Sequence, residues 1–477
     1  MKEYIFLPLY RSFGLRYLLS TKLMDHLSKK YKIVAFIDMD KKPYYESLLK
    51  KYEIIYEDLN SERIEKKNNS IFFNFKKLIK KFICGEKKDF KNKTIDLYKI
   101  KFEKAIKNNR YYFFNLINFF LRKSKILRNI FFYIDEMTDT NNLFLNQFEK
   151  YQPKAVILLS YGYDYDQYFV RDAKKSNCKS ISIIYSWDNP TSKGYKSSNS
   201  DHYLVWNEVM KKELNIFHDI PIKKIEICGV THWENFFIER NNKDNLRKKF
   251  FEENNLTNDK KIILFFSSHP RDFMQGYNII NNISEKFINN ENIIVVARMH
   301  PLILDKALCK KFLGNENVFF EKQIKDKFGE KVLFKNPTLK KFGEKTSEVF
   351  YPSEDFEELS KLYSAADVFI NEFSTTQLEA CIFDLPIIDA AIGKYRETNL
   401  KNSIYGWHHH LYNLKEFNFK TYVDNYTSLN DSILDNLKNP QNLKINREKF
   451  VDNFIGDNIG KASKNIIDNF EKFLKFN

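Results

Sequence analysis

The chain has few of the residues that characterise fibrous, disulfide-rich or membrane-spanning proteins. Its 477 residues include 13 glycines and 11 prolines, too few for a collagen-like or linker-rich protein. The 5 cysteines are scattered, odd in number and free of any CxxC spacing, which argues against a zinc site and a disulfide framework. No apolar run reaches about 18 residues, the length that spans a membrane as a helix. These absences leave a folded protein, either soluble or held at a surface.

Apolar and aromatic residues are plentiful. Hydrophobic residues make up 43% of the chain and aromatic residues 16%, with 45 phenylalanines and 28 tyrosines. This composition excludes intrinsic disorder. At about 150 residues per domain, the length predicts about three domains or two large ones. The N-terminal apolar run Tyr4–Leu9 is too short for a signal peptide and is followed by Arg11 and Arg16, so we expect a cytoplasmic protein.

The formal net charge is +16, and most of it lies in one segment. Between Ile71 and Ile130 there are 17 lysines and arginines against 4 aspartates and glutamates, an excess of 13 positive charges. Within this aromatic-rich segment, lysines and apolar residues over 71–83 alternate with helical spacing, which predicts a basic amphipathic helix. Such a helix can bind an anionic lipid surface, or it can be a lysine-covered helix packed on the core. No nucleic-acid recognition motif accompanies the charge, so we expect no nucleic-acid partner.

Short apolar strands alternate with helical segments in both halves of the chain. The strands expected in the first half are Tyr4–Leu9, Lys32–Ile37, Glu53–Tyr56, Ala155–Ser160, Ser180–Tyr185, Leu204–Trp206 and Ile225–Cys228. Those expected in the second half are Lys261–Ser267, Asn292–Ala297, Val318–Glu321, Val368–Asn371 and Pro386–Asp389. This alternation is typical of parallel sheets covered on both faces. We therefore predict an α/β protein with two Rossmann-like, doubly wound parallel-sheet domains that face a cleft.

A charged, Asn-rich stretch near Glu239–Asp259 separates the two series of strands. It predicts a first domain over 1–240, with the basic helical insertion at about 65–135, and a second domain over 241–445. The tail over 446–477 contains a long helical pattern, Phe450–Leu474, that we expect to cross back to the first domain. Ligands bind outside the carboxyl ends of the strands in such folds, so the chemistry should lie in loops that follow strands.

One candidate loop follows the strand Val368–Asn371. Ser374, Thr375 and Thr376 lead from this strand into a helix whose unpaired N–H groups favour a phosphate. Glu379 is spaced to accept hydrogen bonds from ribose hydroxyls. The alternative interpretation is an ordinary capped helix.

Two further loops of the second domain carry donors for phosphate oxygens. Arg298 and His300 end the strand Asn292–Ala297, and a protonated His300 could stabilise charge on a leaving nucleotide. Ser267 and Ser268 follow the first strand of this domain and add hydroxyl groups. The alternative for these loops is a polar turn.

In the first domain, an acidic and aromatic loop follows the strand Ala155–Ser160. If this loop is extended, Asp164 and Asp166 lie on one side of the chain, with Tyr161 and Tyr163 on the other. One carboxylate is a candidate general base for an acceptor hydroxyl. No histidine or further acid accompanies the pair, so we expect no metal site, and a solvated surface turn is the alternative.

The next loop, Ser186–Gly194, reads Ser-Trp-Asp-Asn-Pro-Thr-Ser-Lys-Gly and is the most unusual string in the chain. Trp187, Asp188, Asn189 and Lys193 suit a loop that holds a sugar face, hydroxyl groups or an anion. A structural loop that begins with the Asn-Pro turn is the alternative.

Together these residues resemble bacterial surface-carbohydrate glycosyltransferases of the GT-B fold, relatives of capsule Kdo transferases, polysialyltransferases and CDP-glycerol glycerophosphotransferases. The string Ser186–Gly194 looks like the Ser-Trp-Asp-Asn-hydrophobic-Thr-Ser-Lys-Gly signature of predicted surface-polysaccharide enzymes, with Pro190 in place of the commoner Leu. Arg298–Pro301 and Ser374–Thr375 are similar to the elements that hold the donor phosphates in those relatives. The resemblance covers about Ala155 to Asp389.

The resemblance implies transfer of a sugar from a CMP-, CDP- or UDP-linked donor to a hydroxyl of a glycan or lipid-linked acceptor, as in capsule or lipopolysaccharide synthesis. The donor would bind the second domain and the acceptor the first, with His300 and either Asp164 or Asp166 as catalytic groups and no metal or cofactor. The basic segment would hold the enzyme on the inner face of the cytoplasmic membrane. Alternatives are a nucleotide-sugar 2-epimerase of the same fold, a glycerophosphotransferase, and a non-enzymatic scaffold that binds nucleotide sugars.

Overall fold

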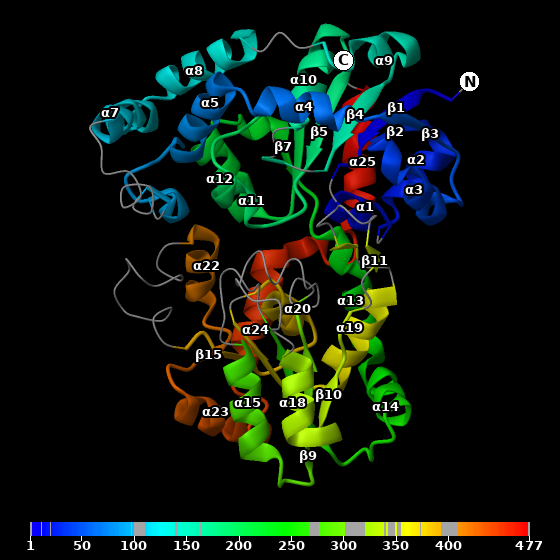
Figure 1. Cartoon of the computed structure of the whole chain (residues 1–477), viewed down its shortest axis with the longest axis vertical. Coiled ribbons are helices and arrows are strands. Elements are labelled where there is room, and N and C mark those ends of the chain that lie inside the picture. The colour runs from blue at the N-terminus through cyan, green and yellow to red at the C-terminus, as the bar shows by residue number, and fades with distance from the viewer. Residues whose placement is uncertain are drawn as a thin grey trace. The chain divides into compact units, whose positions relative to one another are not determined.

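The computed structural model describes residues 2–10, 12–19, 21–96, 98–99, 110–138, 142–159, 161–162, 165–267, 276–300, 320–337, 340–341, 349–350, 354–372, 374–392 and 408–475 (Figure 1). The chain divides into two compact units. The first comprises 1–231, 406–412 and 461–477, and the second comprises 232–405 and 413–460.

The first unit is built on a seven-stranded parallel sheet in the order β3-β2-β1-β4-β5-β6-β7. Its strands are β1 (Tyr4–Pro8), β2 (Lys32–Ile37), β3 (Ile54–Asp58), β4 (Ala155–Leu158), β5 (Lys179–Ile183), β6 (His202–Val205) and β7 (Ile225–Ile227). Side chains on both faces of β1, β2 and β4 are buried because helices cover both sides of the sheet. The strand order reverses between β1 and β4, which places the topological switch point there.

The helices of the first unit include α1 (Ser12–Leu19), α2 (Leu23–Lys30), α3 (Lys42–Leu49), α10 (Asp166–Lys175), α11 (Asn189–Ser192), α12 (Glu208–His218), α22 (His409–Asn413) and α25 (Ala462–Lys475). The C-terminal helix α25 belongs to this unit and is tied to α2, because Glu471 accepts hydrogen bonds from His26 and Tyr31.

The tail is not one continuous helix. α24 (Lys444–Phe450) ends in a π turn (Val451–Ile455) and a short 3-10 turn (Gly456–Asn458) before α25 begins. Gly456 and Gly460 have positive φ angles of 69° and 68°, which interrupt a right-handed helix.

The insertion between β3 and β4 contains α4 (Ser61–Asn68), α5 (Ile71–Phe82), α7 (Arg110–Lys123), α8 (Lys125–Thr138) and α9 (Leu145–Tyr151). The helix predicted over the basic stretch is confirmed as α5. Its lysines do not all face outward, however, because Lys76 and Lys80 both form ion pairs with buried Asp135 of α8. None of the helices formed by the described residues combines the length and apolarity needed to cross a bilayer.

The second unit contains a six-stranded parallel sheet in the order β10-β9-β8-β13-β14-β15. Its strands are β8 (Lys261–Phe266), β9 (Ile293–Arg298), β10 (Val332–Phe334), β13 (Val368–Asn371), β14 (Ile387–Asp389) and β15 (Thr421–Tyr422), and β11 (Lys340–Lys341) pairs with β12 (Val349–Phe350) elsewhere. Numbered within the unit, this order is 3-2-1-4-5-6, the order of a Rossmann-like fold. The predicted doubly wound α/β architecture is confirmed in both units.

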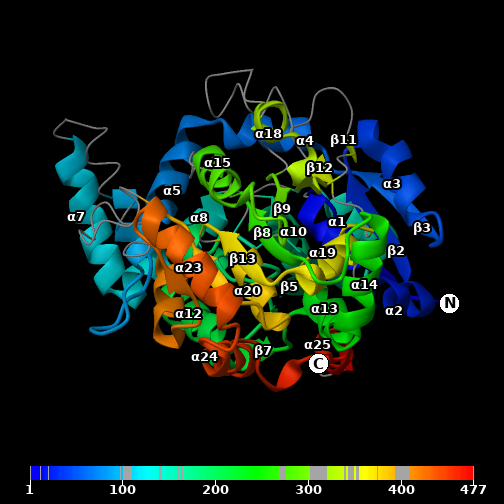
Figure 2. The same ribbon diagram turned by 90° about the horizontal axis from the view of Figure 1, so that it is seen from below.

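Helices cover both faces of the second sheet (Figure 2). α15 (Gly276–Phe287), α18 (Phe320–Phe328) and α23 (Tyr426–Lys438) pack on one face, and α13 (Glu234–Glu239), α19 (Glu354–Ala365) and α20 (Thr376–Ile382) on the other. The prediction of a strand over Val318–Glu321 is wrong at Phe320 and Glu321, because these residues begin α18. Residues 318 and 319 lie outside the described residues. The third strand is instead β10. α14 (Lys243–Glu253) is the one helix expected in the Asn-rich stretch.

Candidate functional site

The switch point of the second unit lies between β8 and β13, and three buried residues meet there. Ser267 follows β8, Glu372 follows β13, and Gly276 begins α15. A Cβ atom on Gly276 would lie 3.2 Å from the Cβ of Ser267 and 3.9 Å from Oε2 of Glu372. The glycine therefore lets the start of α15 approach the strand ends without crowding the side chain of Ser267.

Ser267 also connects this point to the end of β9. Its backbone N–H donates to the carbonyl of Arg298 at 3.0 Å, and its Oγ accepts from the backbone N–H of His300 at 2.7 Å. The guanidinium of Arg298 donates to the carbonyl of Lys335 at 2.8 Å, so this buried side chain extends toward the end of β10. Ser267 and His300 are thus brought together, whereas Ser268 lies outside the described residues.

The segment from Ser374 to Thr376 is held beside the switch point by Asn371. The Nδ2 of Asn371 donates to the carbonyl of Phe266 at 2.7 Å, and its Oδ1 accepts from the backbone N–H of Ser374 at 2.9 Å. Ser374 accepts from the backbone N–H of Thr376 at 3.4 Å, while the side chain of Thr375 makes no capping hydrogen bond. All three hydroxyl-bearing residues are partly exposed.

Glu379 is bonded to the aromatic layer beneath α20. Its Oε2 accepts from the hydroxyl of Tyr363 at 2.7 Å and its Oε1 from the indole N–H of Trp233 at 3.3 Å. The carboxylate is therefore positioned by protein partners, which the sequence spacing did not indicate.

In the first unit, the loop after β4 meets the end of β1. The hydroxyl of Tyr10 donates to Asp166, which is 1% exposed, and the Tyr10 ring stacks on Tyr165 at 4.7 Å. Tyr161 is buried, and burial raises the pKa of its hydroxyl well above the ordinary value. Tyr163 and Asp164 lie outside the described residues.

The loop after β5 is held by its own hydroxyl groups. Asp188 accepts hydrogen bonds from the hydroxyl of Ser186 and, at 2.8 Å, from that of Ser192. Burial opposes ionisation of Asp188, but Lys193 and these hydrogen bonds outweigh it and lower the pKa of the carboxyl. Asn189 is 1% exposed, and its Nδ2 has no hydrogen-bond partner among the described residues.

Glycines bring this loop against its neighbours. A Cβ on Gly162, whose φ is 84°, would lie 2.5 Å from the Cβ of Lys193, so the loops after β4 and β5 touch. Gly194, with φ of 81°, passes so close to α5 that its Cβ would lie 2.8 Å from the carbonyl oxygen of Lys80.

His410 is a candidate functional residue that the sequence interpretation missed. Its ring stands perpendicular to the buried Trp187 with centroids 4.8 Å apart, and its Nδ1 lies 3.3 Å from Oγ1 of Thr191. Burial lowers the pKa of His410 to about 3, so the imidazole is neutral near pH 7 beside ionised Asp188. The sequence feature that could have pointed to His410 is the run of three consecutive histidines, 408–410, in a chain that has 9 histidines.

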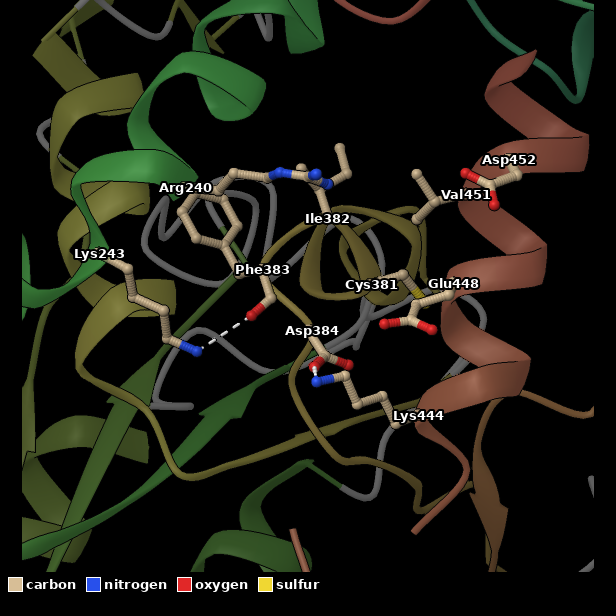
Figure 3. A pocket seen from close by; sticks show the side chains of 10 residues that line it. All are labelled: Arg240, Lys243, Cys381, Ile382, Phe383, Asp384, Lys444, Glu448, Val451 and Asp452. Carbon is tan, nitrogen blue, oxygen red and sulfur yellow. Dashed lines mark hydrogen bonds and ion pairs between the residues drawn. The ribbon is translucent and has the colours of Figure 1, made fainter. Parts of the chain in front are cut away.

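A hollow of about 500 Å³ opens beside the C-terminal end of α20, the opposite end from Ser374 (Figure 3). Two of its lining lysines pair with protein groups: Lys444 lies 3.6 Å from Asp384, and Lys243 donates to the carbonyl of Phe383 at 3.0 Å. The hollow is away from the carboxyl ends of the strands. In the part of the chain that the structure describes, no three histidine, cysteine, aspartate or glutamate side chains gather in a way that could hold a metal ion.

No family model matches this chain, and neither does any curated protein. Solved structures do match. The UDP-GlcNAc 2-epimerase from Neisseria meningitidis bound to UDP-GlcNAc is 14% identical, with a TM-score of 0.54 and coverage of 99% of this chain and 100% of that chain. The MnaA–UDP structure from S. aureus is 12% identical, with a TM-score of 0.52 and coverage of 100% and 98%. A glycosyltransferase from Rickettsia africae is 12% identical, with a TM-score of 0.49 and coverage of 100% of both chains.

The first two similarities, with TM-scores above 0.5, show the fold. The chain has the GT-B type of architecture, with two doubly wound parallel-sheet units.

Proposed function

We propose that the protein is a glycosyltransferase that moves a sugar from a nucleotide-linked donor to a hydroxyl of a glycan or lipid-linked acceptor. The observation that carries the proposal is the meeting of polar residues at the switch point of the second unit, where Ser267 links the ends of β8 and β9. Doubly wound domains bind nucleotides at this point. The GT-B fold supports the proposal, since structures of similar fold contain UDP-GlcNAc or UDP.

In this proposal the donor phosphates of a CMP-, CDP- or UDP-linked sugar lie against Ser267, Ser374 and the imidazole of His300. Ser268, Thr375 and Thr376 supply further hydroxyls, and Arg298 supplies positive charge. A carboxylate accepts up to about four hydrogen bonds, so Glu379 can hold a ribose hydroxyl in addition to Tyr363 and Trp233.

The first unit is proposed to hold the acceptor against the loop Ser186–Gly194, with Trp187 as a sugar platform and Asn189 and Lys193 as polar contacts. Three groups are candidates to take the acceptor proton. Asp164 and Asp166 are the carboxylates, and the Asp166 carboxylate is buried and already accepts from Tyr10. His410 is partly exposed and neutral near pH 7, so one ring nitrogen has a lone pair that can accept the proton, and its lowered pKa makes it a weaker base than an ordinary imidazole.

The reaction would form one bond and break one. The acceptor oxygen attacks the anomeric carbon as its proton passes to the base, and the bond between that carbon and the donor phosphate oxygen breaks. The phosphate leaves with the electron pair, and His300 and the hydroxyl cluster stabilise its charge. A lipid-linked acceptor would place this reaction at the cytoplasmic face of a membrane.

Nucleotide binding tests the donor site. Cytidine, uridine and guanosine nucleotides are added singly, and a rise in the unfolding temperature reports binding. Ser267→Ala and His300→Ala should each weaken the binding of the best nucleotide about 10- to 100-fold, the effect of one hydrogen bond to a charged group. Ser432→Ala on the partly exposed side of α23 is the matched control. Unchanged affinity in both site variants would refute the donor site.

Product analysis separates the alternatives. A purified protein that isomerises a nucleotide sugar in the absence of acceptor is a 2-epimerase, and one that consumes CDP-glycerol is a glycerophosphotransferase. Asp164→Asn, Asp166→Asn and His410→Gln should each keep nucleotide affinity, and the variant of the true base should lose turnover about 100-fold or more. Binding without turnover in the wild-type protein identifies a scaffold.

A further inference from the structure

The helical insertion of the first unit carries most of the exposed apolar side chains. Among the described residues, nineteen large hydrophobic side chains are exposed, and twelve belong to α5, α7 and α8. These twelve are Ile71, Phe72, Phe75, Leu116, Phe119, Phe120, Ile126, Leu127, Ile130, Tyr133, Ile134 and Met137. Scattered exposed apolar residues are ordinary, whereas a cluster of this size marks a surface that contacts another apolar phase.

The polarity of α8 is inverted relative to a helix of a soluble protein. Ile126, Ile130, Ile134 and Met137 recur at intervals of three or four residues and are 49–72% exposed. The opposite face is buried and carries Phe132 together with two charged side chains, Arg128 and Asp135. There Arg128 forms two hydrogen bonds with Asp219, at 2.6 and 2.9 Å.

Asp135 completes this inner polar face. It is 2% exposed and forms ion pairs with Lys76 and Arg171, at 2.9 and 3.2 Å, as well as with Lys80. Both inner charges, Arg128 and Asp135, are paired within the protein. Turning α8 to bury its isoleucines would break these pairs, so we infer that the helix keeps its apolar face outward.

The apolar surface continues onto both neighbouring helices. The Nζ of Lys76 lies 4.8 Å from the centre of the Phe72 ring and 3.4 Å from Oγ1 of Thr138, so the first turns of α5 adjoin the end of α8. At the other end, Arg128 donates to the carbonyl of Leu121 at 2.8 Å and ties α8 to α7. Figure 1 shows the three helices together on one side of the first unit.

The most exposed charges on this surface are positive, and the partly exposed Glu136 of α8 is paired with Lys174 at 2.9 Å. The exposed charged side chains described on α5, α7 and α8 are Lys77, Lys81, Lys123 and Lys125. Glu86 lies next to Lys123, which remains 56% exposed. An apolar helical face bordered by lysines matches the boundary between acyl chains and anionic headgroups, because the side chains enter the acyl layer while the ammonium groups remain among the headgroups.

We propose that α5, α7 and α8 form a docking surface that lies in the interface of an anionic membrane. The apolar stripe of α8 enters the lipid, and the four lysines contact the headgroups. This deepens the proposed function by naming the partner surface of an enzyme whose acceptor is lipid-linked, but the docking itself needs no substrate. The proposed docking also differs from an electrostatic contact made by the lysines of α5 alone, because two of those lysines, Lys76 and Lys80, are paired with Asp135.

Vesicle flotation tests the proposal. We expect the wild-type protein to float with vesicles of equal parts phosphatidylglycerol and phosphatidylcholine, and to bind pure phosphatidylcholine at least tenfold less tightly. Ile126→Ser/Ile130→Ser/Ile134→Ser should weaken binding more than tenfold. Lys77→Gln/Lys81→Gln should weaken it about 10- to 30-fold, from the energy of a lysine near an anionic surface. The matched control Met39→Ser/Ile222→Ser removes exposed apolar residues elsewhere in the unit and should bind as the wild type.

Three results would overturn the proposal: no binding of the wild type to anionic vesicles, equal binding of the triple isoleucine variant, or equal loss in the control variant.

Sedimentation of the protein without vesicles tests whether a second copy of the chain covers this surface instead of a membrane. Self-association that the triple variant abolishes, without vesicle binding, would make this face a dimer interface. The substituted side chains point outward, so the unfolding temperature of the variants should be unchanged. Nucleotide binding is measured on the same variants, and its retention would show that the docking proposal can fail while the donor site stands.

Discussion

A buried ion pair beneath the candidate donor site should be essential to the stability of the second unit. Nζ of Lys420 lies 2.8 Å from Oδ2 of Asp389 and 2.6 Å from Oε1 of Gln377, and the charged side chains are 1% and 0% exposed. Lys420→Met leaves the Asp389 carboxylate buried without its opposite charge, although the Gln377 amide and the backbone N–H of Ala391 still donate to it, both at 3.2 Å. Removing one partner of a buried pair costs about 3–5 kcal/mol.

Calorimetry and hydrogen exchange measure this loss. In a unit of this size, 1 kcal/mol shifts the unfolding temperature by about 2–4 °C, so Lys420→Met should lower that of the second unit by about 6–20 °C. Hydrogen exchange should locate the loss in β14, β15 and α20. The double variant Lys420→Met/Asp389→Asn buries no unpaired charge and should be more stable than Lys420→Met alone.

The control is an exposed pair in the same unit. Lys325 lies 2.6 Å from Glu321 one turn away on α18, and the side chains are 51% and 35% exposed. Lys325→Met should cost about 0.5 kcal/mol or less. If Lys420→Met costs no more than this control, the reasoning from burial is refuted.

Two further predictions concern the first unit. Gly194→Ala should destabilise it by about 1–3 kcal/mol, because φ is 81° and the added Cβ meets the Lys80 carbonyl. The control Gly460→Ala lies in the second unit, also has a positive φ but meets open space, and should cost less. Equal losses of stability by chemical denaturation would contradict the close approach at Gly194. Burial lowers the pKa of His218 to about 4, so between about pH 6.5 and pH 4 the unfolded chain binds more protons and stability falls as the pH falls. From pH 7 to pH 5 this amounts to about 2 kcal/mol. His218→Phe should remove that part of the acid sensitivity measured by hydrogen exchange, and an unchanged pH profile would show that His218 is not the group responsible.

Much of the fold could be predicted from the sequence because buried parallel strands appear as short apolar runs. The strands β1, β2, β4, β8 and β9 were all expected from such runs. The same signal failed at Phe320, since a short apolar run looks alike in a strand and in a buried helix. The break at Gly456 and Gly460 was also missed, although two glycines with positive φ explain it.

The candidate site could be predicted only in part. Loops that follow strands were expected to carry the chemistry, and Ser267 and His300 do meet at a strand end. The hydrogen-bond donors to Glu379, by contrast, are Trp233 and Tyr363, which lie 146 and 16 residues away in the sequence. No local spacing encodes such a contact.

The sequence by itself determined the alternation of strands and helices, because hydrophobic periodicity is a local property of neighbouring residues. The tertiary structure decided the partner of each charged and polar side chain. It placed His410 against Thr191, 219 residues distant, and turned Lys76 and Lys80 inward to Asp135, leaving isoleucines on the outer face of α8. The physical reason is that a buried charge must be paired, and only the packed chain determines which opposite charge is within reach.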